Sequence, residues 1–278
     1  MRSLVGAGAA VVVLATCATG CASEPDATRT ITVFAAASLT QTFTELGDRF
    51  EAANPGTEVV FSFGASSALA EQLRQGAPAD VFAAASPENM GQVVAAGRIT
   101  ATPVTFVRNR LQIAVPAGNP AGIAGLADFG RPEPVLALCA EQVPCGAAAR
   151  KVFDLAGITA QPDTREADVK AVLTKVTLGE VDAALVYRTD VAAAAERVEG
   201  IDFPESERVL NDYPIAPLAA APEPATAAAF VDFVRSPQAR EIFDRAGFAA
   251  PGTPWRGGAR FTGGGRGYWW CPPCARWR

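Results

Sequence analysis

The sequence contains no histidine and only three lysines among its 278 residues. Without histidine the chain lacks the usual general base, the Ser-His-Asp and Cys-His groupings of covalent catalysis, and every imidazole ligand for a metal ion. A formal net charge of −5 gives no basic surface for nucleic acid, and no zinc-finger or basic-helix pattern is present. These absences argue against the commonest hydrolytic enzymes and against a nucleic-acid partner.

Long apolar runs are also missing beyond the N-terminus, because no later segment reaches the ~18 to 20 apolar residues that span a membrane. At the N-terminus, Arg2 is followed by an apolar run from Leu4 to Ala15 and then by small residues. This order is typical of an export signal. We therefore expect residues 1–20 to be a lipoprotein signal peptide.

The segment Ala18-Thr19-Gly20-Cys21 resembles the bacterial lipobox, in which the cysteine becomes the lipidated first residue of the mature protein. Cys17 is a competing lipidation site, and an ordinary cleaved signal is the alternative interpretation. With Cys21 lipidated, residues 21–30 become a short polar linker. The expected location is extracytoplasmic, with the protein anchored by lipid to the outer face of the cytoplasmic membrane.

The rest of the chain alternates between strand and helix patterns, with 49% hydrophobic and 19% charged residues, as in folded proteins. Strands are expected at 31–36, 57–63, 79–84, 134–139 and 181–187, and extended crossings at 105–115 and 208–216. Helices are expected at 39–52, 66–75, 87–96, 146–156, 168–178, 224–235 and 237–246. Such alternation predicts an α/β protein with sheets covered by helices.

The two extended crossings divide this alternation into two units with a cleft between them. We expect lobe I to comprise residues 31–108 and 212–251 and lobe II to comprise residues 109–211, with the ligand at the carboxyl ends of the strands. Residues 252–278 are rich in glycine and arginine and carry no acid, which predicts a disordered tail. The tail's CPPC string resembles a thioredoxin-type motif but has no βαβ context, which argues against a redox role.

Serine follows two of the strands expected in lobe I. Strand 31–36 leads to Ser38 and strand 57–63 leads to Ser66, each at the start of a helix, where serine is a favoured N-cap. The first N–H groups of a helix have no partner within it and, with the positive end of the helix dipole, attract anions. Two such corners predict a shared anionic ligand, although either serine alone is more simply a cap.

Lobe II offers two more helix starts and a phenol. Val143-Pro144-Cys145-Gly146 precedes an alanine-rich helix, and proline suits a helix start. Asp168 is expected to cap the next helix and not to bind the ligand, because a carboxylate repels an anion. The strand 181–187 ends at Tyr187, whose hydroxyl can donate a hydrogen bond into the cleft.

From about Ile31 to Pro251 the chain resembles the molybdate-binding proteins of bacterial ABC importers. The strings VFAAASL, FGASSAL, GAPADVFAAAS, VPCG, ADVKAVL, LVY and SPQAREIFDRAGF stand in that family's order and at roughly its spacing. The resemblance implies a two-lobed periplasmic-binding-protein fold of type II. In that fold two parallel or mixed sheets are flanked by helices and joined by two crossover segments.

The resemblance also implies an extracytoplasmic receptor, without enzymatic activity or cofactor, that binds molybdate and tungstate in the interlobe cleft. It would deliver the anion to an ABC permease and act as a monomer. The implied ligands are the hydroxyls of Ser38, Ser66 and Tyr187 and the backbone N–H groups of Cys145 and Val169, with no direct bond from the protein to molybdenum. Cys145 stands where the family commonly has alanine, and a backbone contact tolerates that change.

Two cysteines remain in lobe II after Cys17 and Cys21 are assigned to the signal and the lipid. Cys139 and Cys145 are close in sequence, and in an exported protein such a pair favours a disulfide. Two buried thiols are the alternative.

Three other functions fit the sequence less well than a molybdate receptor does. Only the family motifs distinguish a molybdate receptor from a receptor for sulfate or another small oxyanion. An enzyme on this fold would need a base or nucleophile pair, against which the missing histidine argues. The effector lobe of a transcription regulator would need a helix-turn-helix at one end, where this chain has an export signal.

Overall fold

A computed structural model describes residues 28–252 of the chain. The expected signal peptide, the lipidation site at Cys21 or Cys17, and the tail after residue 252 lie outside the described residues. Within residues 28–252, none of the helices is long and apolar enough to cross a membrane.

The chain alternates between strands and helices along its whole described length. Its first part forms β1 (Arg29–Ala36), the 3-10 turn η1 (Ala37–Leu39), α1 (Thr40–Ala53), β2 (Thr57–Gly64), α2 (Ser66–Arg74), β3 (Val81–Ala83) and α3 (Pro87–Ala95). The middle part forms β4 (Val104–Pro116), η2 (Leu126–Gly130), β5 (Leu136–Cys139), α4 (Pro144–Ala156), β6 (Thr164–Glu166), α5 (Val169–Thr177), β7 (Ala183–Tyr187), α6 (Arg188–Ala193), β8 (Val198–Ile201) and η3 (Pro204–Arg208). The last part forms β9 (Leu210–Pro217), α7 (Pro224–Val234) and α8 (Pro237–Ala246).

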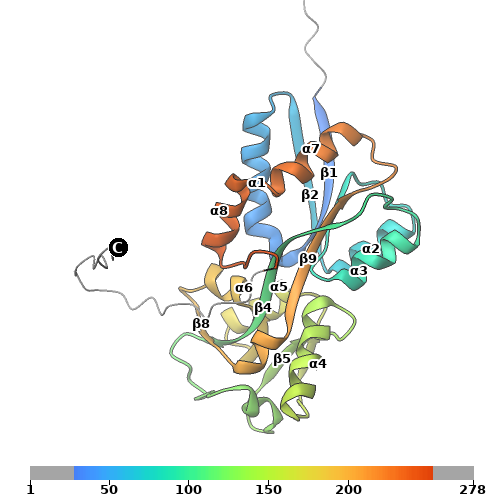
Figure 1. The fold of residues 1–278 in the computed structure, drawn as a ribbon. Helices are drawn as coiled ribbons and strands as arrows, with labels where there is room; N and C mark the ends of the chain where they lie inside the picture. The colour runs from blue at the N-terminus through green and yellow to red at the C-terminus, as the bar shows by residue number, and fades with distance from the viewer. Residues whose placement is uncertain (1–27, 253–278) are drawn as a thin grey trace, which may run out of the picture.

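The long strand β4 joins two groups of strands into one nine-stranded sheet with the order β2-β1-β3-β9-β4-β7-β5-β6. From Val104 to Arg110, β4 pairs with β9, whereas from Leu111 to Pro116 it pairs with β7 and β8. β1 is parallel to β2 and β3, and β5 is parallel to β6 and β7, while all pairs with β4 or β9 are antiparallel. Figure 1 shows β4 and β9 running side by side from one half of the molecule into the other. The α/β class expected from the sequence is confirmed.

Helices cover both faces of the β1–β2–β3–β9 group. On one face, α1, α7 and α8 pack through aromatic side chains such as Phe43, Phe230 and Phe243. On the other face, α2 and α3 contribute residues such as Leu73 and Val93. Because both faces are buried, β1 is entirely apolar from Val33 to Ala36, as parallel strands between two helical layers are.

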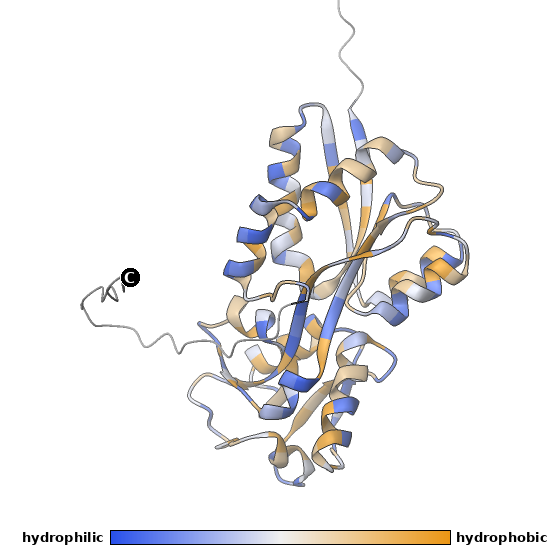
Figure 2. Cartoon of the chain, viewed as in Figure 1, coloured by the Kyte–Doolittle hydropathy of each residue, from blue (hydrophilic) through white to orange (hydrophobic). Residues whose placement is uncertain are grey.

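A separate hydrophobic cluster surrounds β5 and β7 and draws all its fully buried members from residues 111–203. Between this cluster and those of the first group, β4 and β9 carry polar residues in register, with Arg108 opposite Asp212 and Asn109 opposite Asn211. This polar stretch is visible as the blue segment of the two crossing strands in Figure 2. The cores thus lie on opposite sides of the crossing, although the exact lobe boundaries remain a prediction.

All the elements expected from the sequence are present, and their ends lie within two residues of the expected ones. The sequence analysis missed β6, α6, β8 and the 3-10 turns η1, η2 and η3. These elements are three to six residues long, which is too short for a hydrophobic period to emerge. Their positions are decided by the strands and helices that they contact.

Candidate functional site

A small cavity of about 20 Å³ lies where the carboxyl ends of β1, β2 and β3 meet the starts of α4 and α5. Its lining residues are Ala36, Ala37, Ser38, Gly64, Ala65, Ser66, Ala85, Val143, Pro144, Cys145, Asp168, Val169 and Tyr187. On this scale a single water molecule needs ~10–15 Å³. The cavity therefore suits a small ion and excludes an organic ligand of ordinary size. All five residues expected to bind the ligand line it.

Ser38 reaches the cavity from a position that the sequence analysis described wrongly. It was expected to cap the first helix, but it lies in the middle of η1, and α1 begins only at Thr40 without a side-chain cap. The Ser38 hydroxyl is instead hydrogen-bonded to the hydroxyl of Tyr213, at 2.8 Å and buried. A tertiary partner has thus displaced the local capping interaction, which no local pattern around Ser38 could reveal.

Ser66 was likewise expected to cap its helix, and this is also wrong, because Ala65 is the N-cap and Ser66 is the first residue of α2. The Ser66 side chain accepts a hydrogen bond from the backbone N–H of Ala85 at 2.9 Å and is almost completely buried. With Oγ accepting from Ala85, the Ser66 O–H proton is left to donate to a ligand in the cavity.

Cys145 lies in the first turn of α4, where backbone N–H groups have no partner within the helix. A disulfide joins it to Cys139 at the end of β5. Gly146 comes next, and a Cβ there would lie 1.9 Å from the carbonyl oxygen of Ala140. The disulfide and this close approach hold the start of α4 against the loop that follows β5, so the N–H of Cys145 is presented at the cavity.

Gly146→Ala should therefore destabilise the protein, because its Cβ would meet backbone atoms that cannot turn away. We expect a loss of ~1–3 kcal/mol in the free energy of unfolding, as for other overpacked sites. Gly91 in α3 is the matched control, since nothing lies within 4 Å of its Cβ position. Gly91→Ala should be neutral or stabilising by up to ~1 kcal/mol. Urea denaturation of both variants measures the difference, and equal stabilities would contradict the assigned role of Gly146.

Val169 is the first residue of α5, and Asp168 caps this helix as expected. The Asp168 carboxylate accepts from the N–H groups of Lys170 and Ala171 at 2.8 and 3.0 Å. The cap therefore takes the second and third N–H groups of the helix and leaves that of Val169 at the cavity. Asp168 also lines the cavity, so the site contains one carboxylate, whose Oδ1 is already engaged by two N–H groups.

Tyr187 ends β7 and closes the cavity from the side of lobe II. Its side chain is fully buried, and its hydroxyl accepts a hydrogen bond from the amide of Asn211 at 3.1 Å. Burial, together with the nearby Tyr213 and Asp190, raises the pKa of Tyr187 well above its ordinary value. The phenol is therefore protonated at all physiological pH values and has a proton to donate.

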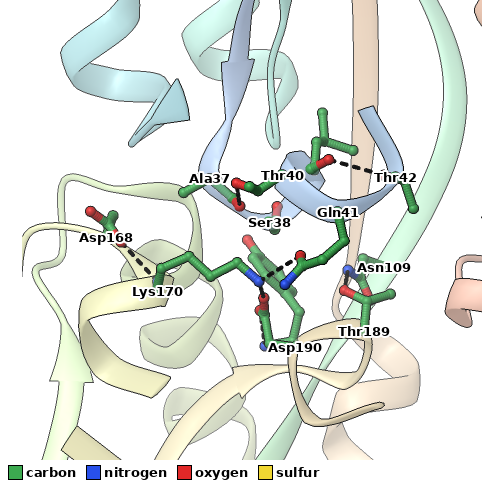
Figure 3. Close-up of polar contacts among 12 residues, drawn as sticks. Ala37, Ser38, Thr40, Gln41, Thr42, Asn109, Asp168, Lys170, Thr189 and Asp190 are labelled. Atoms are coloured by element: carbon green, nitrogen blue, oxygen red, sulfur yellow. Dashed lines mark hydrogen bonds and ion pairs between the residues drawn. The ribbon is translucent and has the colours of Figure 1, made fainter. Parts of the chain in front are cut away.

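An ion pair between Lys170 and the buried Asp190 lies within lobe II next to Tyr187, and Lys170 also reaches Gln41 in lobe I, as Figure 3 shows. The Lys170 ammonium lies 2.8 Å from Asp190 Oδ1 and donates to Gln41 Oε1 of α1 at 3.0 Å. Asp190 is completely buried, and its other oxygen accepts from the backbone N–H of Tyr187. Burial raises the pKa of Asp190, and the charge of Lys170 opposes that rise.

The cavity offers hydrogen-bond donors from both lobes. Three hydroxyls and two helix starts converge on it, and no arginine or lysine is among its lining residues. In residues 28–252 no group of three or more histidine, cysteine or acidic side chains could hold a metal ion. Such an arrangement can bind a small anion through neutral donors and helix dipoles.

Sequence reasoning missed the residues behind the cavity. Asn211 and Tyr213 stand two apart on β9 and so share a face, as the alternation of an extended strand indicates. That alternation could have suggested a common surface but not its contact with Ser38 or Tyr187. Lys170 and Asp190 gave no local signal at all.

Comparisons with known proteins place these observations in a family. Residues 31–249 match the family model described as bacterial extracellular solute-binding protein. The chain is 45% identical over 223 residues to the molybdate-binding protein ModA of Mycobacterium tuberculosis, covering 80% of this chain and 85% of that protein.

Two solved structures share the fold. One is the periplasmic molybdate-binding protein of Azotobacter vinelandii, with a TM-score of 0.68, 22% identity, and coverage of 80% of this chain and 99% of that chain. The other is the sulfate-binding protein SubI of Mycobacterium tuberculosis, with a TM-score of 0.70, 19% identity, and coverage of 81% of this chain and 88% of that chain. At these identities the likeness extends to the fold alone, which both anion specificities share.

Proposed function

This chain belongs to the family of bacterial extracellular solute-binding proteins, and from that premise we propose that it is the receptor that captures molybdate for an ABC importer. The observation that carries the proposal is the convergence of donors from both lobes on one ion-sized cavity. The relative with 45% identity, which is named as a molybdate-binding protein, supports molybdate as the anion. Tungstate has the same charge and shape and should bind as well.

The proposed ligands are the hydroxyls of Ser38, Ser66 and Tyr187 with the backbone N–H groups of Cys145 and Val169. A tetrahedral dianion loses its water on entering the cavity, and hydrogen bonds to a charged group, each worth ~1.5–3 kcal/mol, replace that hydration. Neutral donors also avoid a guanidinium that would bind phosphates and carboxylates in the same way. The protein contributes no bond to molybdenum itself and needs no cofactor.

The donor set explains why phosphate should be rejected near neutral pH. A protonated oxyanion carries an O–H that needs an acceptor, and an unpaired polar hydrogen in a buried site costs ~1–3 kcal/mol. The one carboxylate of the lining, Asp168, is engaged by the N–H groups of Lys170 and Ala171 through Oδ1 and repels a dianion. Sulfate has no such proton but has shorter bonds, so it should underfill the cavity.

We further propose that the protein acts outside the cytoplasm as a monomer, with a lipid on Cys21 and an ABC permease as its partner. Closure of the two lobes over the anion would bury it and present both lobes together to the permease. This step follows from the two-lobed arrangement and from the export signal in the sequence.

Isothermal titration calorimetry of the purified protein with molybdate, tungstate, sulfate and phosphate at pH 7.5 tests the proposal. We expect molybdate and tungstate to bind tightly, sulfate much more weakly, and phosphate negligibly. Tighter binding of sulfate than of molybdate would instead assign a sulfate receptor. Phosphate binding as tight as molybdate binding would show that Asp168 accepts a proton from the ligand and that the donor argument is wrong.

A further inference from the structure

A network of buried hydroxyls and amides lies behind the cavity and ends at Ser38. Tyr213 of β9 is fully buried, and its hydroxyl lies 2.8 Å from Ser38 Oγ. Tyr213 is not among the residues that line the cavity, so it does not contact the ligand. Its ring packs edge-on against Tyr187, with centroids 6.0 Å apart. Any effect of its hydroxyl on the ligand must therefore pass through a neighbour.

Two amides behind the phenols have fixed orientations. Asn211 donates through Nδ2 to the carbonyl of Ala85 at 3.0 Å, and a carbonyl can only accept. Asn109 accepts through Oδ1 from the backbone N–H of Arg110 at 3.0 Å, and an N–H can only donate. The Nδ2 groups of both asparagines are thereby identified, and an amide NH₂ can only donate. Asn211 gives one of its protons to the Tyr187 hydroxyl.

These orientations determine where the proton of Tyr213 points. Burial raises the pKa of Tyr213, while hydrogen bonds with Ser38, Asn109 and Tyr187 lower it, so the phenol is protonated and well connected. The Nδ2 group of Asn109 can only donate to Tyr213. The Tyr187 oxygen already accepts from Asn211, and in the complex its single proton is assigned to the anion. Neither neighbour therefore offers a free acceptor to the Tyr213 hydroxyl. The oxygen that remains for its own O–H is Ser38 Oγ.

We propose that Tyr213 is a positioning residue that donates its hydroxyl proton to Ser38 and thereby turns the Ser38 O–H toward the cavity as a donor to the bound oxyanion. The inference rests on the proposed function, since it assigns a role in anion binding. A hydroxyl that accepts one hydrogen bond is polarised and becomes a better donor in the next. Tyr213 thus makes Ser38 a directed donor without touching the ligand.

Tyr213→Phe tests this role, because it keeps the buried ring and removes only the hydroxyl. Molybdate affinity should fall by about three- to tenfold, the effect of one neutral hydrogen bond. If Tyr213 acts through Ser38, the double variant with Ser38→Ala should bind molybdate within about twofold of Ser38→Ala alone, since contacting residues are not additive. Calorimetry on the full chain measures all four proteins.

A purely structural role of Tyr213 would give a different pattern. In that case the two fold-changes would multiply in the double variant, and this result would overturn the proposal, as would an unchanged affinity in Tyr213→Phe. Phe248→Leu is the packing control, because the Phe248 ring lies 5.6 Å from that of Tyr213 and has no hydroxyl. It should lower the unfolding temperature but leave molybdate affinity within about twofold, since it removes no donor.

The same measurements separate this inference from the proposed function. If the unmutated protein does not bind molybdate, the proposed function is wrong and the role of Tyr213 falls with it. If the unmutated protein binds molybdate but the double variant loses affinity multiplicatively, only the role of Tyr213 is wrong. Should Tyr213→Phe be too unstable for titration, Ser38→Ala and Asn109→Leu replace it. Asn109→Leu removes a donor to Tyr213, and its loss of affinity must likewise disappear in the Ser38→Ala background.

Discussion

Replacing Ser66 by alanine should weaken molybdate binding by about 10- to 150-fold, which corresponds to one charge-assisted hydrogen bond of ~1.5–3 kcal/mol. The Ser66 oxygen already accepts from the N–H of Ala85, so its single proton is free for the anion. Tyr187→Phe should weaken binding in the same direction, because the phenol accepts from Asn211 and likewise has its proton to donate. Calorimetric titration with molybdate measures both losses.

Ser67 provides the matched control for Ser66. It occupies the next position of α2 but is not among the residues that line the cavity. Ser67→Ala should therefore keep molybdate affinity within about twofold, because no donor to the anion is removed. Unchanged molybdate affinity in both Ser66→Ala and Tyr187→Phe would place the ligand elsewhere in the molecule.

Lys170→Met should cost about 3–5 kcal/mol of stability at neutral pH, because it leaves the charge of the buried Asp190 without its partner. Lys170 lies 2.8 Å from the Asp190 carboxylate, which is completely buried. Lys175→Met is the control, since Lys175 pairs with Glu180 at 3.2 Å and Glu166 at 3.7 Å, both partly exposed, and such pairs contribute only ~0–1 kcal/mol. Urea denaturation gives the free energies of unfolding.

The loss in Lys170→Met should depend on pH. Burial raises the pKa of Asp190 in the folded protein above its unfolded value of 3.8, and Lys170 opposes the rise, so the variant's folded pKa is higher still. A raised acid pKa means that folding favours the protonated carboxyl. The loss of stability in Lys170→Met is therefore full at pH values above the pKa of Asp190 in the folded variant. It shrinks as the pH falls through that pKa toward 3.8.

Measurements at pH 7.5 and pH 5 test this dependence. Adding Asp190→Asn to Lys170→Met should recover most of the stability at pH 7.5, because the side chain is then neutral and can still accept from the N–H of Tyr187. A penalty that is equal at both pH values, or one that Asp190→Asn does not relieve, would show that the lost charge is not its cause.

The sequence predicted which residues meet at one cavity better than it predicted the local interactions of those residues. Ser38, Ser66, Cys145, Val169 and Tyr187 all line one cavity. Each stands at the end of a strand or the start of a helix, and in an α/β fold such ends gather at one edge of the sheet. That argument uses only the order of the elements, so it can be made from one sequence.

The two serine caps were wrong for a reason that concerns both residues. N-cap preference is a local tendency of ~1 kcal/mol, and a buried tertiary hydrogen bond can replace it. Ser38 bonds to Tyr213, which is 175 residues away, and Ser66 bonds to the N–H of Ala85. Asp168, which has no such competing partner among the described contacts, caps α5 as expected.

The sequence by itself determined the α/β class, the longer elements and the family, because these depend on hydrophobic period, turn residues and motif order along the chain. Only the tertiary structure decided the direction of each donor at the cavity and the ion pair beside it. Lys170 meets Gln41 across 129 residues of sequence. Hydrogen bonds and ion pairs form between side chains that folding brings together, and their partners carry no period that a single sequence displays.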